Sequence, residues 1–333
     1  MTGVRDLCAL PKAHLHVHLE GAMRPATLTE LAEAAGAAPP PIGNRLTFPE
    51  FMRLYTIATE LVRTPDELRR LVREVVEDAA ADGAVWVEPH FYPTRYAGAL
   101  GPGYDTEQAV VELVIDEATR TAERLGIGAG ILLSALRHAD VGEAVRLAEL
   151  AARYVGSGVV SFGLAADESL FPPEPFAPAF AVARDAGLIS APHAGELAGP
   201  VSVYGALDAL GARRLCHGVR AVEDPALVER LAADGVVLDV CPTSNLLLEV
   251  VPSLAEHPLA RLLAAGVRCT LNGDDPLLFG PGVLGEYELA RDSLGLSDEQ
   301  LAALARTSIE ASGAPPALIA AGVTGVDAWL SNP

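Results

Sequence analysis

Eight short apolar runs recur along the chain, and longer amphipathic stretches of helical period separate them. Such alternation is typical of parallel β-strands that helices join in βαβ units. Eight units in one chain predict an α/β fold in the form of a (β/α)8 barrel, or TIM barrel. The runs are HLHVHL (14–19), VWVEPHF (85–91), IGAGILLS (127–134), VVSFGLA (159–165), LISAPHA (188–194), RLCHG (214–218), VVLDVCP (236–242) and VRCTLNGDD (267–275). The clearest amphipathic stretches are 66–81, 107–125, 141–154 and 224–233.

A doubly wound parallel sheet is the competing fold. It usually carries a glycine-rich dinucleotide-binding turn directly after its first strand. The first run is followed by EGAMRPATL (20–28), which contains no such turn, so the sequence favours the barrel. No low-complexity linker divides the chain, and we expect a single domain over residues 1–333.

The segment between the first two runs, residues 21–84, is longer than one connecting helix requires. Its part TFPEFMRLYTIATELV (47–62) is amphipathic and rich in large apolar residues. Insertions at the carboxyl-terminal rim of a barrel commonly shape the active site, so we predict a helical insertion after strand one that covers the mouth. A helix packed on the outside of the barrel is the alternative.

The chain of 333 residues has 44 acidic side chains and 24 lysines and arginines, which gives a formal net charge of −20. An acidic surface repels phosphate backbones and argues against a nucleic-acid partner. No uncharged apolar run reaches the ~20 residues of a membrane helix, and the N-terminus does not have the pattern of a signal peptide. We therefore expect a soluble cytoplasmic protein with no membrane partner. Its four cysteines are far apart in sequence and are expected to be reduced.

Unusual polar residues stand where the predicted strands end. His16 and His18 close the first run, and residues i and i+2 of a strand point to the same face. His193 closes the fifth run and Asp274 the eighth, and the carboxyl ends of all barrel strands meet at one rim. Three imidazoles and one carboxylate form a cage suited to zinc, with a position left for water. The HxH pair alone would fit two satisfied structural histidines equally well.

Lys12 is the only lysine of the chain, and it precedes the first strand. Many hydrolases of this fold hold two metals that a carboxylated lysine bridges at the end of strand four. Strand four ends here in GLAADE (163–168), so a lysine bridge is not available. We predict a single metal ion, Zn2+, per chain.

Three more polar residues lie close to the predicted cage. Glu196 is outside the ligand set and could act as an acid if a closed site raises its pKa, or it is an ordinary glutamate at a helix start. His217 is placed to orient or deprotonate a bound water, or it is a buried structural histidine. Asp275 could accept a hydrogen bond from a substrate ring nitrogen or cap the next helix. The remaining histidines are interpreted as supports of the rim, His90 and His138, or as a solvent-facing loop residue, His257.

Five segments jointly resemble the signature segments of the adenosine deaminase family within the amidohydrolase superfamily, and they occur in the family's order. They are PKAHLHVHLEGA (11–22), APHAGE (191–196), CHGVRA (216–221), CPTSN (241–245) and LNGDDP (271–276). The resemblance implies a (β/α)8 barrel with one zinc ion that catalyses hydrolytic deamination of a 6-aminopurine. It implies that the zinc ligands are His16, His18, His193 and Asp274. It also implies that Glu196 donates a proton to the ring, that His217 serves the hydrolytic water, and that Asp275 binds the purine.

Two departures from the family's pattern concern the substrate. Glu20 stands where adenosine-specific enzymes commonly have aspartate, and we expect it to bind a sugar hydroxyl if the substrate is a nucleoside. Ala166 stands where the nucleoside enzymes have a glycine whose backbone N–H meets the purine, and its methyl group could crowd the ring. We rank adenosine-like nucleosides first, with free adenine or another 6-aminopurine derivative as alternatives. A hydrolase of a non-purine ring and a non-catalytic nucleoside-binding protein are the interpretations from other classes.

Overall fold

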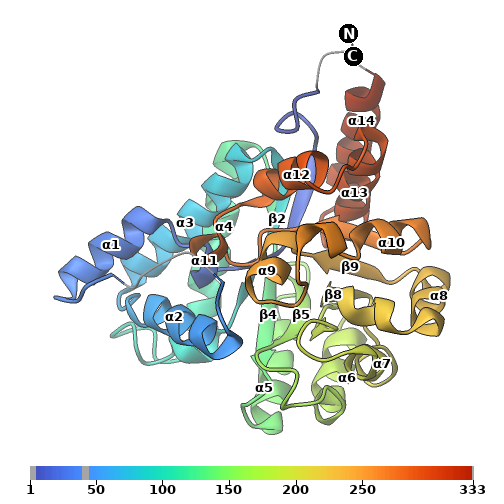
Figure 1. Cartoon of the computed structure of the whole chain (residues 1–333). Coiled ribbons are helices and arrows are strands. Elements are labelled where there is room, and N and C mark those ends of the chain that lie inside the picture. The colour runs from blue at the N-terminus through green and yellow to red at the C-terminus, as the bar shows by residue number, and fades with distance from the viewer. Residues whose placement is uncertain (1–4, 40–44, 332–333) are drawn as a thin grey trace.

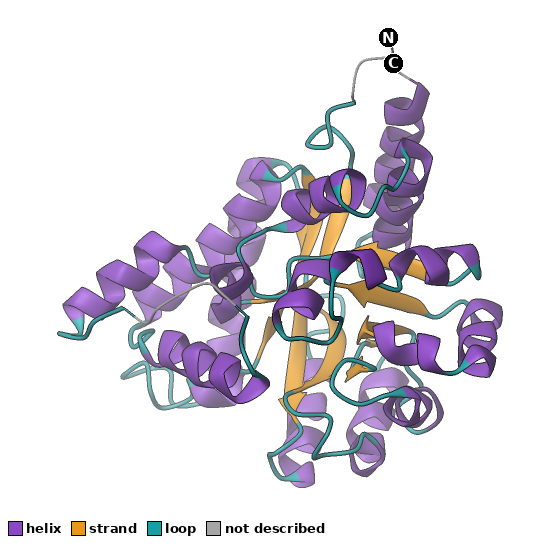
Figure 2. Ribbon diagram, viewed as in Figure 1, coloured by secondary structure: helices purple, strands orange, loops and turns teal. Residues whose placement is uncertain are grey.

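A ring of parallel strands forms the centre of the computed structural model, and helices surround it (Figures 1 and 2). The structure describes residues 5–39 and 45–331, so residues 40–44 of the predicted insertion lie outside the described residues. The strands are β1 (Lys12–His18), β2 (Ala84–Phe91), β3 (Gly128–Ala129), β4 (Ile131–Leu136), β5 (Val159–Ala165), β6 (Ile189–Ser190), β7 (His193–Ala194), β8 (Arg214–His217), β9 (Val237–Val240) and β10 (Arg268–Leu271).

These ten strands occupy the eight predicted positions. Two of the positions each contain two short strands, β3 with β4 and β6 with β7. Gly130 separates β3 from β4, and its N–H still donates to Val87 of β2 at 3.0 Å. Ala191 and Pro192 separate β6 from β7, and the N–H of Ala191 donates to Phe162 of β5 at 3.0 Å. Each pair of short strands is therefore one barrel strand with an irregular residue or two inside it.

The helices that follow the strands begin and end close to the predicted stretches. Four of them are α3 (Pro65–Ala81), α4 (Glu107–Leu125), α5 (Val141–Ala152) and α8 (Pro225–Asp234). The others are α1 (Pro25–Ala34), α2 (Phe48–Glu60), α6 (Ala177–Asp185), α7 (Pro200–Asp208), α9 (Pro242–Leu247), α10 (Leu259–Ala264), α11 (Pro276–Phe279), α12 (Val283–Asp292), α13 (Asp298–Glu310) and α14 (Pro316–Ser331). None of the helices within 5–39 and 45–331 combines the length and the apolar character needed to cross a membrane.

The segment between β1 and β2 is helical where it is described, with α1 and α2 at one side of the barrel in Figure 1. A reciprocal pair of hydrogen bonds between Thr47 and Glu50 starts α2, as in a capping box. The ring of Phe51 on α2 stacks on Phe279 of α11 with ring centres 5.4 Å apart. Helix α2 thus contacts the short helix that follows β10, at the rim where the strands end, and it is not on the outer wall of the barrel.

Two sheets of hydrogen-bonded strands meet between β1 and the residues after β10. The N–H of Asp274 donates to His16 at 3.1 Å, and the N–H of His18 donates to Asp274 at 2.9 Å. Two residues before Asp274, the amide oxygen of Asn272 accepts from the N–H groups of Leu15 and His16 at 2.8 and 3.0 Å. Backbone and side-chain hydrogen bonds together close the barrel at this seam.

Below the mouth, the barrel interior holds an ion-paired arginine instead of an entirely apolar filling. Arg214 on β8 lies 2.8 Å from the Glu88 carboxylate and 2.9 Å from that of Asp239, and all three side chains are buried. Glu88 also accepts from Trp86 Nε1 at 2.9 Å. Buried charges persist when they are paired and hydrogen-bonded, and this set ties β2, β8 and β9 together.

We expect Asn272→Ala to destabilise the fold by about 2–5 kcal/mol, because it leaves two buried N–H groups of β1 without an acceptor. The side chain of Asn272 is fully buried, so water does not replace the lost amide oxygen. Chemical denaturation followed by circular dichroism measures the change. The control is Thr324→Ala on the exposed side of α14, which should cost less than about 0.5 kcal/mol. Equal stability of the two variants would show that Asn272 does not close the seam.

Candidate active site

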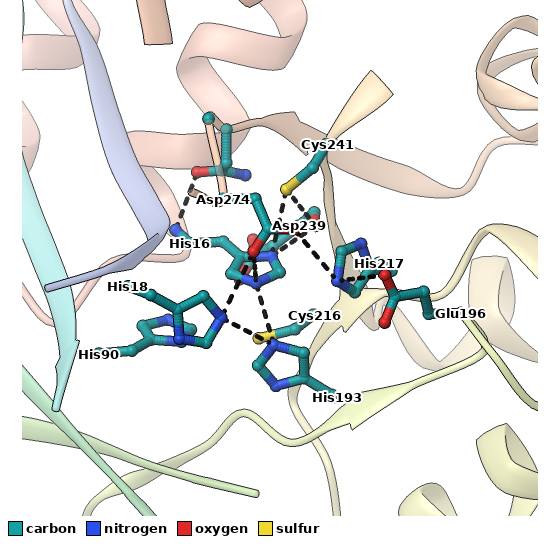
Figure 3. Close-up of polar contacts among 12 residues, drawn as sticks. His16, His18, His90, His193, Glu196, Cys216, His217, Asp239, Cys241 and Asp274 are labelled. Atoms are coloured by element: carbon teal, nitrogen blue, oxygen red, sulfur yellow. Dashed lines mark hydrogen bonds and ion pairs between the residues drawn. The ribbon is translucent and has the colours of Figure 1, made fainter. Parts of the chain in front are cut away.

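Four side chains converge at the mouth of the barrel (Figure 3). Two imidazoles come from β1, one comes from β7, and the carboxylate of Asp274 comes from the loop after β10. His193 Nε2 lies 3.1 Å from His16 Nε2 and 3.2 Å from His18 Nε2. Asp274 Oδ1 lies 3.1 Å from His16 Nε2 and 3.4 Å from His18 Nε2. The structure therefore brings together the four side chains that the sequence proposes as metal ligands.

The spacing and the outer hydrogen bonds of these imidazoles fit a metal ion. Tetrahedral ligands about 2.0–2.1 Å from zinc stand about 3.3 Å from one another, close to the separations found here. His16 Nδ1 donates to the carbonyl of Asp239 at 3.2 Å, and His193 Nδ1 donates to that of Leu164 at 3.0 Å. A carbonyl only accepts, so both rings carry their proton on Nδ1 and turn a bare Nε2 to the cluster.

His90, interpreted from sequence as a support of the rim, lies directly against the same cluster. Its ring stacks on His16 with centres 5.0 Å apart. His90 Nε2 donates to the carbonyl of Leu15 at 3.0 Å, and its buried Nδ1 has no hydrogen-bond partner among the described residues. Groups of side chains close enough to share an ion also include His90, His217 or Asp275, so distance alone allows several ligand sets.

Glu196 follows β7 on a loop that a second glutamate holds in place. The Glu168 carboxylate accepts from the N–H groups of Gly195 and Ala198 at 3.0 and 2.8 Å, from the N–H of Glu196 itself, and from Ser202 Oγ at 2.7 Å. Glu168 was not among the site residues proposed from sequence, although it lies in the same GLAADE segment as Ala166. The Glu196 side chain is buried, and burial together with the Asp274 and Glu168 charges raises its pKa well above the usual value.

His217 ends β8 beside Glu196, as Figure 3 shows. Its Nε2 lies 3.5 Å from Glu196 Oε1 and 3.8 Å from Asp274 Oδ2, and burial lowers its pKa to about 3. His217, Asp274 and Ala166 have positive φ angles of 66°, 58° and 78°, a conformation that costs non-glycine residues about 1–3 kcal/mol. Three of the strained residues of the described chain thus line one cavity, a distribution typical of functional sites.

Asp275 is fully buried, and neither of its carboxylate oxygens has a hydrogen-bond partner among the described residues. It precedes α11 but makes no side-chain cap there, so the helix-cap interpretation is wrong. Its side chain packs on Gly21, where a Cβ would lie 1.6 Å from Asp275 Oδ1. Burial, opposed by His18, and the Asp274 charge raise the pKa of this carboxyl well above its usual value. An unpaired buried acceptor at a cavity wall is a feature that a ligand donor would satisfy.

Glu20, expected to bind a sugar hydroxyl if the substrate is a nucleoside, is not among the residues that line the cavity. Its two oxygens accept from the hydroxyls of Tyr55 and Tyr96 at 2.9 and 2.8 Å. Only 3% of Glu20 is exposed, and Tyr55 on α2 lines the cavity where Glu20 does not. Tyrosine hydroxyls from two distant segments therefore occupy the carboxylate, and sequence position alone gave no sign of them.

The cavity has a volume of about 660 Å³, counting the space at its open mouth. Its inner end is polar, and its outer wall is largely apolar and aromatic. None of the lining residues in the described chain is a lysine or an arginine. The lining consists of His18, Phe48, Phe51, Met52, Tyr55, His90, Phe91, Tyr92, Ser134, Leu136, Ala165, Ala166, His193, Glu196, His217, Leu248, Asp274 and Asp275.

Lys12, His257 and the cysteines lie outside the cluster or beside it. Lys12 lies at the start of β1, far along the strand from the cluster, and donates to the Asp82 carbonyl at 2.7 Å. His257 is 6% exposed and hydrogen-bonded, so its interpretation as a solvent-facing residue is wrong. The N–H of Leu259, the first residue of α10, donates to His257 Nδ1 at 3.2 Å, and loop composition did not reveal that contact. All four cysteines lie in the described ranges and are free thiols, and Cys241 Sγ is 3.3 Å from His16 Nδ1.

The barrel and the convergent side chains at its carboxyl-terminal rim define a class, a (β/α)8 barrel of the amidohydrolase type with a site fit for a metal ion. The chain belongs to the adenosine deaminase family, whose model matches residues 11–321. A Streptomyces coelicolor protein whose name gives adenosine or adenine as its substrate is 44% identical over 99% of each chain. An adenine deaminase of Mesorhizobium japonicum is 37% identical over 90% of this chain and 93% of its own length.

Solved structures agree with this assignment and confirm the predicted barrel. The adenine deaminase of Arthrobacter aurescens has a TM-score of 0.86 at 30% identity, with 96% of this chain and 99% of that chain covered. A zinc-containing amidohydrolase of Burkholderia ambifaria has a TM-score of 0.83 at 30% identity, over 99% and 96% of the two chains. An Arabidopsis N6-mAMP deaminase has a TM-score of 0.86 at 27% identity, over 97% and 99%.

Replacement of the carboxylate at the cluster should release the metal. We expect the purified chain to hold about one divalent ion, and Asp274→Asn to weaken its binding by more than the roughly 10–100-fold that follows loss of an outer partner. Asparagine tolerates the positive φ of this position, so the fold should survive. Elemental analysis and chelator competition measure the binding, with His138→Ala on the exposed surface as the control. Two tightly bound ions per chain, or unchanged affinity in Asp274→Asn, would contradict this assignment.

Proposed function

We propose that the chain, acting as a single domain, catalyses the hydrolytic deamination of a 6-aminopurine. One zinc ion would be held by His16, His18, His193 and Asp274. The observation that carries the proposal is a pair of buried carboxyl groups beside the cluster, Glu196 and Asp275, whose pKa values are raised by burial and by neighbouring carboxylates. One suits the delivery of a proton to a ring nitrogen, and the other suits the acceptance of a hydrogen bond from the ring.

When bound, zinc would make a water molecule nucleophilic at neutral pH. The raised pKa of Glu196 keeps a proton on its carboxyl, which is then available to the ring nitrogen next to the carbon that bears the amine. Addition of the water oxygen to that carbon and protonation of the ring nitrogen would give a tetrahedral carbon that bears a hydroxyl and the amine, and the proton that the water loses would restore the carboxyl of Glu196. The amine would then take the hydroxyl proton and leave as ammonia, which gives the 6-oxo product. Asp275 orients the purine through a ring N–H.

The wall of the cavity favours a free base over a nucleoside or a nucleotide. The hydroxyls of Tyr55, Tyr92 and Ser134 already donate within the protein, to Glu20, Glu143 and the Ala135 carbonyl. Sugar hydroxyls would meet mainly the apolar side chains Phe48, Phe51, Met52, Leu136 and Leu248. Phosphate sites usually contain cationic side chains, and a phosphate here would meet no lysine or arginine among the described lining residues. We therefore place adenine before adenosine, which reverses the ranking drawn from sequence.

Ammonia release from a panel of aminopurines tests this proposal. We expect kcat/KM to be highest for adenine, lower for adenosine and deoxyadenosine, and lowest for AMP, with N6-methyladenine included because an apolar wall would accept its methyl group. A missing partner for a polar substrate group costs roughly 1–3 kcal/mol, so adenosine should fall about 5- to 150-fold below adenine. A higher value for adenosine would reverse the substrate order. No ammonia from any member would refute the deaminase proposal itself.

Glu196→Gln should keep the fold and the metal but lower kcat by about 10²–10⁴-fold, because the amide has no proton to deliver to the ring nitrogen. Glu196 is outside the proposed ligand set, so metal content is the internal check on the site. Glu149→Gln on the exposed side of α5 is the matched control and should retain full activity. Turnover within a few-fold of the unmodified enzyme would mean that another group supplies the proton.

A further inference from the structure

A chain of buried hydrogen bonds leads from the first residue of α10 to the active-site imidazole of His217. The backbone N–H of Leu259 donates to His257 Nδ1 at 3.2 Å. His257 Nε2 lies 3.2 Å from Asn245 Oδ1, and Asn245 Nδ2 lies 3.2 Å from His217 Nδ1. The side chains of His257, Asn245 and His217 are all buried, so water does not compete for these contacts.

The backbone N–H of Leu259, at one end of this series of hydrogen bonds, determines which atom donates and which accepts in each of them. An amide N–H can only donate, so His257 Nδ1 is an acceptor and the proton of that ring is on Nε2. His257 Nε2 therefore donates to Asn245, which fixes the amide of Asn245 with its oxygen toward His257 and its nitrogen toward His217. The amide nitrogen donates to His217 Nδ1, so this atom carries no proton. The proton of the neutral His217 ring is left on Nε2.

We infer that Asn245 and His257 are positioning residues that hold His217 with its proton on Nε2, so that His217 donates a hydrogen bond to the oxygen nucleophile instead of removing its proton. The inference rests on the proposed function for the identity of that oxygen. His217 Nε2 faces carboxyl oxygens, since it lies 3.5 Å from Glu196 Oε1 and 3.8 Å from Asp274 Oδ2.

The position of its proton separates His217 from the proposed metal ligands. His16 and His193 donate from Nδ1 to backbone carbonyls and keep Nε2 bare, as a ligand must. His217 has the opposite arrangement, because its Nδ1 accepts and its Nε2 bears the proton. Distance alone would allow His217 to share an ion with His16, His193 and Asp274, and the hydrogen bond from Asn245 removes it from that set.

Histidine nitrogen spectroscopy tests the proton position without any substrate. Long-range ¹H–¹⁵N correlation spectra of the metal-loaded protein, labelled with ¹⁵N-histidine, distinguish rings protonated on Nδ1 from rings protonated on Nε2. We expect His217 to be protonated on Nε2, with its signals assigned by their loss in His217→Gln. The exposed His138→Gln is the matched control and should leave those signals in place. A proton on Nδ1 of His217 would overturn the inference.

Asn245→Asp reverses the last hydrogen bond and gives opposite predictions for a donor and for a base. A carboxylate only accepts, so His217 would move its proton to Nδ1 and present a bare Nε2 to the cavity. If His217 is a donor, kcat should fall about 10²–10³-fold, the typical effect of losing one oriented hydrogen-bond donor, with KM changed by less than about 3-fold. If His217 is a base, an aspartate behind it is the favourable partner, and kcat should be unchanged or higher.

The two experiments keep this inference apart from the proposed function. If the unmodified chain releases ammonia from no aminopurine, the proposed function fails, while the spectrum still reports the proton position. If the chain is an active deaminase and Asn245→Asp keeps full kcat with the shifted proton, His217 is a base and the inference fails. Should Asn245→Asp not fold, the spectrum of the unmodified protein decides alone.

Discussion

Two backbone hydrogen bonds at Asp274 determine the geometry of the whole site. The N–H and the carbonyl of this residue pair with His16 and His18 and so join the last strand position to the first. The same residue, held at a positive φ of 58°, directs its carboxylate to the two imidazoles of the strand that it closes against. The same hydrogen bonds of Asp274 therefore close the barrel and bring the proposed metal ligands together. A metal bound there would stabilise the strained backbone that presents its ligands.

Histidines that crowd one mouth take different roles because their outer nitrogens have different partners. A backbone carbonyl behind His16 and another behind His193 leave a bare nitrogen toward the centre. An amide N–H behind His217 leaves a protonated nitrogen there instead. The partner behind each ring thus decides whether the ring binds a cation or donates to an anion. Residue type and proximity do not separate the two roles.

The sequence predicted the strand and helix positions and the convergence of His16, His18, His193 and Asp274 because both depend on periodicity and on the common direction of parallel strands. It did not predict what lies behind each side chain. Glu20 accepts from tyrosines 35 and 76 residues away, and His257 is buried with hydrogen bonds to Asn245 and to the N–H of Leu259. Such partners are chosen by tertiary packing, which leaves no local pattern in the chain.

The carboxylates near the mouth show which groups serve the fold and which await a ligand. Glu168 and Glu20 have their oxygens taken up by backbone N–H groups, a serine and tyrosines, so they position the loop of Glu196 and helix α2. Asp275 is buried to the same degree and has no donor among the described residues. An unsatisfied buried acceptor costs about 1–3 kcal/mol, and water, an ion or a bound molecule can supply the missing partner. The contrast between Asp275 and the fully paired Glu20 therefore supports the proposal that a substrate donor binds at Asp275, at the inner end of the cavity.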